Sequence, residues 1–372
     1  MLDLKEGLGR KDFSMKIIYV CERPYNTYRT LLHAANSDNE MDLVLTNNIE
    51  GMEAMCDELR KSGLFGKVYF FNELKHKTFF HPLKMKNNFS IRKFADIKRV
   101  AVLAFRLIGG FVDYIKSQRK ARHIKLPDGL DFDKYDEIHI TDCNSIMNFY
   151  LYYKKYDNLI YVEHAKNALS ETYPNITYLI SLLTKLRLVY GIRGSYRRIR
   201  AIEVNKTEGL HPDTKNKEIR EIPLESLVDA LSTEQKNFIY QIYAKSFKFD
   251  FPSDSIIDLF LTTSNLGPVE LNMFVHVCKE VIKNHMYDAD YIVIKPHPND
   301  RVDYSELSDI YSNVVLLPSS FSAEMFLLSS TLKVRNFIVY ESSSTGAFIP
   351  AEKCVLIDAE FIDKCRESFP TT

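Results

Sequence analysis

Short runs of β-branched and aromatic residues alternate along this chain with longer segments in which apolar residues recur every three or four positions. Runs of the first kind predict buried strands, and segments of the second kind predict the helices that cover them. Such alternation is typical of α/β domains with parallel sheets. The predicted strands are 16–21, 41–46, 67–71, 137–141, 159–163, 257–262, 291–295, 314–317, 337–340 and 354–357. The predicted helices are 25–35, 51–62, 91–117, 145–154, 173–187, 232–245, 268–284, 322–328 and 360–368.

A polar, irregular stretch around 205–218 divides this pattern into two α/β halves. We therefore predict an N-terminal Rossmann-like domain over 15–204 and a C-terminal one over 205–372, with residues 1–14 as a disordered leader. Ligands of such folds bind beyond the carboxyl ends of the strands. The functional residues are expected directly after strands, in a cleft between the two domains.

Composition and charge narrow the class of protein. The chain has 372 residues, 45% of them hydrophobic, which is enough for two ordinary cores. Lys and Arg total 49, as do Asp and Glu, so no overall charge would hold a nucleic acid, and we expect no nucleic-acid partner. The six cysteines lack paired spacing, which favours reduced thiols in the cytoplasm. The longest apolar stretch, 100–112, is shorter than the ~20 residues of a spanning helix.

One segment departs from the neutral average. Between residues 84 and 125, twelve Lys and Arg residues accompany only Asp96 and Asp113, and apolar runs lie among them. A basic helix with an apolar face can lie on an anionic membrane surface or hold a polyanion. The alternative is a solvated, lysine-rich helix that packs on its own sheet.

No Walker A, G-x-G-x-x-G, G-x-S-x-G or H-E-x-x-H motif occurs in the chain, which argues against the commonest nucleotide hydrolases, dehydrogenases and zinc proteases. Three strand ends remain as candidates. The first is the strand 291–295, which ends in Lys295, Pro296, His297 and Pro298, with Asp300 just beyond. The two prolines restrict the backbone around His297, which suits a phosphate contact or a proton donor to a leaving group. The alternative is a histidine in a plain proline turn.

The second strand end is rich in hydroxyl groups. The predicted strand 337–340 runs into Ser342, Ser343, Ser344 and Thr345. Hydroxyls and backbone N–H groups gathered at one strand end can cradle an anion, although serine clusters are more often simple loops.

The third strand end places two titratable groups side by side. The strand 159–163 delivers Glu163 and His164, and either side chain could remove a proton from a hydroxyl group. As an isolated pair they are more often a surface salt bridge.

Two further positions are weaker candidates. Leu266 and Gly267 follow the first strand of the second half and precede a predicted helix, so their amides could meet a phosphate or a base edge. Glu324 begins another predicted helix and could accept hydrogen bonds from ribose hydroxyls. Its alternative role is a capping glutamate that reaches back to Ser320 or Phe321.

In this order, the motifs resemble those of the bacterial sialyltransferase and polysialyltransferase group, glycosyltransferase families 52 and 38, and more distantly family 80. The segment 16–25 with the following 30–34 is similar to the first strand and helix of family 52. The Lys-Pro-His-Pro-Asn-Asp run at 295–300 resembles the HP motif, 321–324 resembles the acidic position, and 342–344 resembles the serine motif.

The resemblance implies an α/β protein of the GT-B fold, with an N-terminal acceptor domain and a C-terminal nucleotide-sugar domain. It implies an inverting, metal-independent transferase that uses a CMP-activated sugar and needs no cofactor. On this analogy His297, Ser343 and Ser344 bind the phosphate of the departing CMP. The other predicted donor-binding residues near them are Lys295, Ser342 and Thr345.

The same analogy assigns the ribose to Glu324 and the nucleotide to the loop of Leu266 and Gly267. The family's acidic motif has two acids and a glycine, whereas this chain has Glu163, His164 and an alanine. The general base is therefore Glu163 or His164, because a histidine with a pKa near 6.5 is a competent base at neutral pH. The altered motif also leaves room for another activated donor.

We therefore expect a glycosyltransferase that moves sialic acid from CMP-sialic acid to a capsular or lipooligosaccharide acceptor. We expect it in the bacterial cytoplasm, with 84–125 as its contact to the inner face of the plasma membrane. The alternatives are a related HP-motif transferase of Kdo, a neutral sugar or glycerol phosphate, and a non-catalytic nucleotide- or glycan-binding relative. The short closing helix after Asp358 fits a truncated chain or exchange between the subunits of a homodimer.

Overall fold

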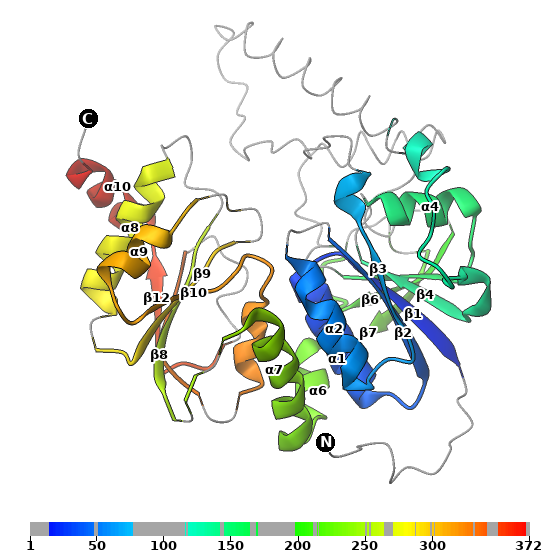
Figure 1. Ribbon diagram of the computed structural model, residues 1–372, viewed down its shortest axis with the longest axis horizontal. Coiled ribbons are helices and arrows are strands. Elements are labelled where there is room, and N and C mark those ends of the chain that lie inside the picture. Colours follow the sequence, from blue (N-terminus) through cyan, green and yellow to red (C-terminus); the bar gives the residue numbers. More distant parts are fainter. Residues whose placement is uncertain are drawn as a thin grey trace, which may run out of the picture. The chain divides into compact units, whose positions relative to one another are not determined.

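The computed structural model places residues in two compact units, each built on a parallel sheet (Figure 1). The first unit comprises residues up to 22, 38–48 and 65–223, and the second comprises 23–37, 49–64 and 224–372. The residues that the structure describes are 15–47, 51–76, 116, 118–141, 145–163, 169, 198–210, 214, 216–249, 251–252, 254–263, 271–286, 288–297, 300, 302–329, 332–340 and 349–369.

The first unit has a seven-stranded sheet in the order β3-β2-β1-β4-β5-β6-β7, with every neighbouring pair parallel. Its strands are β1 (Lys16–Cys21), β2 (Glu40–Thr46), β3 (Val68–Phe71), β4 (Glu137–Ile140), β5 (Leu159–Val162), β6 (Ile199–Val204) and β7 (Glu218–Glu221). Helix α4 (Ile146–Lys154) and the 3-10 turns η2 (Glu73–Lys75) and η4 (Phe132–Lys134) belong to the same unit. The inner strands are almost wholly buried, as expected for a parallel sheet covered on both faces.

The second unit has a five-stranded parallel sheet in the order β10-β9-β8-β11-β12. Its strands are β8 (Ile256–Leu261), β9 (Tyr291–Lys295), β10 (Val314–Leu316), β11 (Lys333–Tyr340) and β12 (Lys353–Ile357). One face packs against α8 (Leu271–His285), α9 (Ser305–Ile310) and α10 (Ala359–Ser368), while α7 (Thr233–Phe247) lies on the other side of the sheet (Figure 1).

Helix α1 (Pro24–Asn36) follows β1 along the chain but clusters with the second unit. The Asn36 side chain donates to the Leu227 carbonyl of α6 (Leu224–Asp229) at 2.8 Å, and the Gln235 side chain of α7 donates to the Ala35 carbonyl at 2.9 Å. The turn η1 (Met52–Met55) and helix α2 (Cys56–Ser62) also pack against α7. The second unit therefore gains three elements from the first quarter of the chain.

Local sequence explains where these helices begin and end. The Ser232 hydroxyl caps α7 by accepting from the Gln235 N–H, and the Gln235 side chain accepts from the Ser232 N–H, which is a complete capping box. The Ser145 hydroxyl caps α4 by accepting from the Asn148 N–H at 3.0 Å. Helix α2 ends where Gly63 adopts a left-handed conformation, φ 69°, that a glycine adopts without strain.

The ten predicted strands all occur, within a few residues of their predicted ends. Strands β6 and β7 and helices α6 and α9 were not predicted, and the predicted helix over 322–328 is the 3-10 turn η6 (Ala323–Leu327). The predicted helices 91–117 and 173–187 lie largely outside the described residues.

The predicted domain boundary at 204/205 differs from the division that the structure makes. Strand β7 pairs with β6 from Ala201 to Val204, so the first sheet continues to Glu221. The polar stretch around 205–218 is thus a connection within one sheet, because a crossover between parallel strands also leaves the sheet through polar loops.

Candidate active site

The HP turn begins where β9 ends and is bonded to the neighbouring strand β8. The backbone N–H of His297 donates to the Thr262 hydroxyl at 3.1 Å, and Thr262 directly follows β8. The Asp300 N–H donates to the His297 carbonyl at 2.7 Å, which closes the turn. The histidine backbone is therefore held at the carboxyl end of two adjacent parallel strands, where ligands of open α/β sheets bind.

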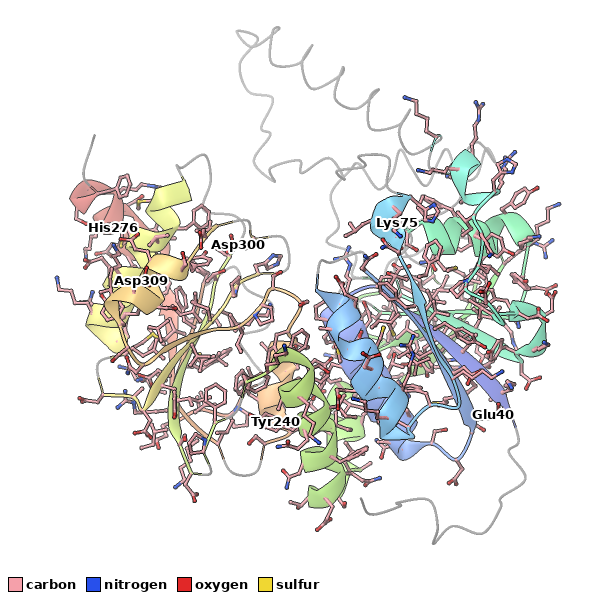
Figure 2. The ribbon with its side chains drawn as sticks, in the orientation of Figure 1. Glu40, Lys75, Tyr240, His276, Asp300 and Asp309 are labelled. Carbon is pink, nitrogen blue, oxygen red and sulfur yellow. The ribbon has the colours of Figure 1, made fainter. Side chains whose placement is uncertain are left out.

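The Asp300 carboxylate organises the rest of this turn (Figure 2). It accepts hydrogen bonds from the Thr262 hydroxyl at 2.6 Å, from the Tyr304 hydroxyl at 2.7 Å and from the Val302 N–H at 3.0 Å. Burial, together with the nearby Asp300 charge, raises the pKa of Tyr304, so its hydroxyl remains a donor at neutral pH. We call Thr262, Asp300 and Tyr304 the HP brace, because they immobilise the turn that presents His297.

Lys295 is a buried cation beside the same turn. Its side chain is 6% exposed, and its ammonium group donates to the carbonyls of Pro296, at 2.6 Å, and Ser319, at 3.3 Å. Burial lowers the pKa of Lys295 to about 8, although the carboxylates of Glu324 and Asp300 partly oppose this shift. The lysine thus joins the HP turn to the chain before η6.

The segment that carries Glu324 is anchored by aromatic packing. The fully buried ring of Phe321 makes edge-on contacts with Tyr243, Phe247 and Phe249, with ring centroids 5.1 to 5.7 Å apart. Such arrangements suit the quadrupoles of aromatic rings. They fix the entry into η6, and with it the position of Glu324.

Glu324 is not the predicted cap that reaches back to Ser320 or Phe321. Its carboxylate accepts a hydrogen bond from the Ser322 hydroxyl at 2.5 Å. Ser322 precedes η6 and Glu324 lies in its first turn, so the bond orients the carboxylate within η6.

Buried polar groups from α1 and the 318–327 segment lie in the same unit. Among the described residues, the side-chain polar atoms of Asn26, Tyr28 and Ser320 have no hydrogen-bond partner, although all three residues are buried. Burial and the nearby Glu324 charge raise the pKa of Tyr28, which keeps its hydroxyl protonated. Gly51, at φ +88°, comes so close to Ser320 that a Cβ would lie 2.7 Å from the serine oxygen. Because buried polar groups are normally paired, these groups are candidates for ligand contacts.

Glu163 belongs to the first unit. It follows β5 and is buried, and its Oε2 atom accepts two hydrogen bonds from Asn205: one from the backbone N–H at 2.9 Å and one from the side-chain amide at 3.0 Å. Asn205 follows β6, the neighbour of β5. This asparagine holds the carboxylate in one orientation at the carboxyl end of the first sheet.

The structure brings together part of the predicted site. Lys295, His297 and Glu324 lie in the second unit, on segments joined by Lys295, while Glu163 lies in the first. The remaining predicted residues lie outside the described part of the chain: His164, Leu266, Gly267, Ser342, Ser343, Ser344 and Thr345. Among the described residues, no group of three or more His, Cys, Asp or Glu side chains is arranged to hold a metal ion.

Sequence reasoning did not select several residues of this site. Thr262 is the last residue of the predicted strand 257–262, and this strand-end position was the available signal for it. Tyr304, Asn205, Asn26 and Tyr28 had no such signal, because their roles depend on partners from other segments.

A parallel α/β protein in two units, with a fixed histidine beyond a strand of the second sheet, has the architecture of the GT-B glycosyltransferases. The model of glycosyltransferase family 52 matches residues 139–363, which is more than half of the chain. The chain therefore belongs to glycosyltransferase family 52, and it is a glycosyltransferase, as the sequence motifs predicted. The match includes both Glu163 and His297.

No curated protein matches the chain. Solved structures resemble it at low identity. UDP-GlcNAc 2-epimerase from Neisseria meningitidis bound to UDP-GlcNAc is 14% identical, with 87% of this chain and 77% of that chain covered and a TM-score of 0.42. The S. aureus MnaA–UDP structure is 11% identical over 95% and 87% of the two chains, with a TM-score of 0.43. The E. coli heptosyltransferase WaaC with ADP is 12% identical over 94% of each chain, with a TM-score of 0.33.

Proposed function

We propose that this glycosyltransferase transfers sialic acid from CMP-sialic acid to a glycan acceptor, with inversion at the anomeric carbon and without a metal ion. Membership of family 52 supports the assignment, together with the sequence resemblance to bacterial sialyltransferases. We further propose a capsular or lipooligosaccharide acceptor and a cytoplasmic enzyme at the inner face of the bacterial membrane. No helix among the described residues is long and apolar enough to cross a membrane.

The observation that supports this chemistry best is the anchored HP turn. Because Thr262 holds the backbone of His297 and Asp300 holds Thr262, the imidazole starts from a fixed point beyond β9. A positioned imidazole can donate a proton, or a hydrogen bond, to a departing phosphate without reorganising. In the proposed reaction His297 stabilises CMP as it leaves, and Ser343 and Ser344 assist it.

The proposed reaction is a single in-line displacement. A base on the first unit, Glu163 or His164, removes the proton from the acceptor hydroxyl as its oxygen attacks the anomeric carbon. The bond from that carbon to the CMP phosphate breaks, and the phosphate keeps the electron pair. Asn205 fixes the Glu163 carboxylate, which supports its candidacy as the base. Glu324 is proposed to bind the ribose, and the loop of Leu266 and Gly267 is proposed to bind the nucleotide.

Thermal unfolding with CMP, CDP, UDP and GDP tests the donor. A ligand that binds only the folded state raises the melting temperature, and we expect CMP to give a clear increase. The increase should persist with EDTA present, because no metal is required. Stabilisation by UDP alone would contradict a CMP-linked donor, and loss of turnover with EDTA would contradict the metal-free reaction.

Turnover of CMP-sialic acid tests the catalytic residues. His297→Ala should lower kcat by about 10²-fold or more, because removal of one general acid typically costs that much, while the melting temperature should stay near that of the wild type. His276→Ala is the matched control, since His276 lies on the surface helix α8 (Figure 2) and bonds Ser368. Glu163→Gln and His164→Gln then identify the base, because only the variant without it should lose transfer at neutral pH. Unfolding of His297→Ala would instead show a structural histidine.

A further inference from the structure

The first unit contains a cavity at the end of the sheet opposite to Glu163. It has a volume of about 510 Å³ and lies between η4, the carboxyl end of α4 and the loop into β5. Asp157 lines it and precedes β5, whereas Glu163 follows β5. Six residues of extended chain span about 20 Å, so this cavity is distinct from the proposed base.

Three aromatic residues are among those that line the cavity. Phe132 is buried, and its ring centroid lies 6.5 Å from that of Tyr150 and 6.0 Å from that of Tyr156. All three residues line the cavity. Phe132 and Tyr150 are buried and Tyr156 is half-buried, so Tyr156 is the ring that offers apolar surface to solvent, of the kind that the C–H groups of a pyranose ring pack against.

The polar groups of the cavity are largely balanced in charge by the protein itself. Asp131 pairs with Lys134 at 3.3 Å, and Asp157 lies 3.7 Å from Arg198. The Lys154 ammonium group lies 5.6 Å from the ring centroid of Tyr150. No uncompensated cluster of one sign is left, so the cavity suits a neutral ligand better than a cation or a polyanion.

The backbone around the cavity is held in one conformation. The Asp131 carboxylate accepts the Asp133 N–H at 3.2 Å and so shapes η4. Lys155 adopts a left-handed conformation, φ 66°, at the end of α4, where a glycine is usual, and its carbonyl accepts from Arg198 at 2.8 Å. Unusual backbone conformations at non-glycine residues often mark functional positions. A cavity with fixed walls binds a ligand with little loss of conformational entropy.

We propose that this cavity binds a neutral pyranose unit of a glycan. Carboxylates of Asp133 and Asp157 accept hydrogen bonds from sugar hydroxyls, the Lys154 ammonium donates to a ring or hydroxyl oxygen, and Tyr156 packs against the C–H face. This assignment rests on the proposed function: the bound glycan is the acceptor. The cavity holds a sugar unit of the acceptor that is distant from its reacting hydroxyl.

Binding of neutral sugars to the full-length protein tests the site directly. Saturation-transfer NMR with methyl β-glucoside, methyl β-galactoside and lactose should show binding of at least one of these probes. Tyr156→Ala should weaken it about tenfold, since an aromatic contact contributes roughly 1 kcal/mol. Asp133→Asn should weaken it too, without altering the melting temperature. Tyr153→Ala is the matched control, because Tyr153 is a nearby exposed tyrosine, at the end of α4, that does not line the cavity.

The outcomes separate this site from the proposed transferase reaction. Tyr156→Ala should leave the CMP-induced increase in melting temperature unchanged, and should raise the KM of an oligosaccharide acceptor without lowering kcat. If Tyr156→Ala weakened sugar binding but CMP did not raise the melting temperature, the result would support the sugar site and contradict a CMP-linked donor. The inference would be overturned if none of the sugars bound, or if they bound equally well to Tyr156→Ala. It would also be overturned if the polycation spermidine displaced the sugar from the same residues.

Discussion

Thr262 shows how much a single hydroxyl can contribute to this site. It accepts the N–H of His297 and donates to the carboxylate of Asp300, and so connects the end of β8 to the turn after β9. Valine has the same shape as threonine but cannot make either bond. Through these two bonds Thr262 positions the backbone of His297.

We predict that Thr262→Val lowers kcat for transfer about tenfold with little change in the KM for the donor. The loss of two hydrogen bonds should also cost about 2 kcal/mol of unfolding free energy, because a buried acceptor and a buried donor lose their partner. Thr262→Ser keeps the hydroxyl and should restore kcat. Equal kinetics for the valine and serine variants would show that the HP brace does not matter for catalysis.

Lys295 makes a second prediction at the same scale, through its pKa of about 8. Its ammonium form prevails below that pH, so CMP affinity should fall as the pH rises from 7 to 9. The free energy of unfolding, in contrast, should rise with pH. The unfolded lysine keeps its proton up to about 10.4, so between pH 8 and 10 the folded state gains up to about 1.4 kcal/mol per pH unit from this group.

Lys295→Met checks both parts of this prediction. Calorimetric titration with CMP should show weaker binding at pH 7 and no dependence on pH near 8. Chemical denaturation should show a smaller gain in stability at alkaline pH than in the wild type. CMP affinity that stays constant across pH 7–9 in the wild type would contradict a role for the ammonium charge.

Among the elements, the strands of the first sheet are joined by a buried charge network. Arg220 of β7 makes two hydrogen bonds to Glu137 of β4, at 2.9 and 3.0 Å, and His139 bonds the same carboxylate at 2.9 Å. Burial alone would raise the pKa of Glu137, but hydrogen bonds from His139 and Arg220 outweigh it and lower the value to about 2. The network joins β4 to the edge strand β7 across two intervening strands.

Because the folded pKa of Glu137 lies below its unfolded value of about 4.3, its contribution is present above that pH. It should be lost as the pH falls toward 2. We predict that Glu137→Gln lowers stability at pH 7 by about 2 kcal/mol and flattens the loss of stability between pH 5 and 3. Urea denaturation at several pH values measures both quantities. Parallel pH curves for the two proteins would contradict the assignment.

The turn η6 depends on aromatic packing for its position. Phe321→Ala removes the ring at the centre of the Tyr243, Phe247 and Phe249 contacts, and should cost about 3–5 kcal/mol of unfolding free energy. CMP affinity should fall as well, because Glu324 lies in η6. Leu356→Ala, on an exposed side chain of β12, should change stability by less than about 0.5 kcal/mol and serves as the control. If folded Phe321→Ala bound CMP as tightly as the wild type, the position of η6 would not matter for donor binding.

For the whole molecule, equal numbers of acidic and basic residues conceal the basic segment 84–125. Most of this segment lies outside the described residues, and its membrane contact remains a prediction. Residue 116 is helical, as predicted for the end of 91–117, and residues 118–121, beyond the predicted end, are helical as well.

We predict that the protein sediments with anionic lipid vesicles at low salt and is released at high salt. The attraction between the basic segment and the anionic lipids is electrostatic, and salt screens it by shortening the Debye length. The double variant Lys98→Gln with Arg99→Gln should bind less. Lys333→Gln with Lys353→Gln, two exposed positions of the second unit, is the control of equal charge. Binding to neutral vesicles, or equal binding by all three proteins, would contradict an electrostatic contact.

Local patterns in the chain were sufficient for the α/β class, for the ten predicted strands and for His297 as a strand-end residue. A run of β-branched residues is buried in any parallel sheet, so its identity as a strand depends on neighbouring residues alone. Strands β6 and β7 escaped prediction because each carries charged residues, such as Glu203 and Arg220, inside a short run. Arg220 is paired there with the carboxylates of Glu137 and Glu218.

Long-range contacts determined the rest. Residues that are distant in the chain come together in the packing of α1 on the second unit, in the HP brace, in the Asn205 bond to Glu163 and in the cavity beside η4. Burial and hydrogen bonding set the pKa of Lys295 and orient each carboxylate, and these depend on which segments the fold brings into contact. No pattern of neighbouring residues contains that information.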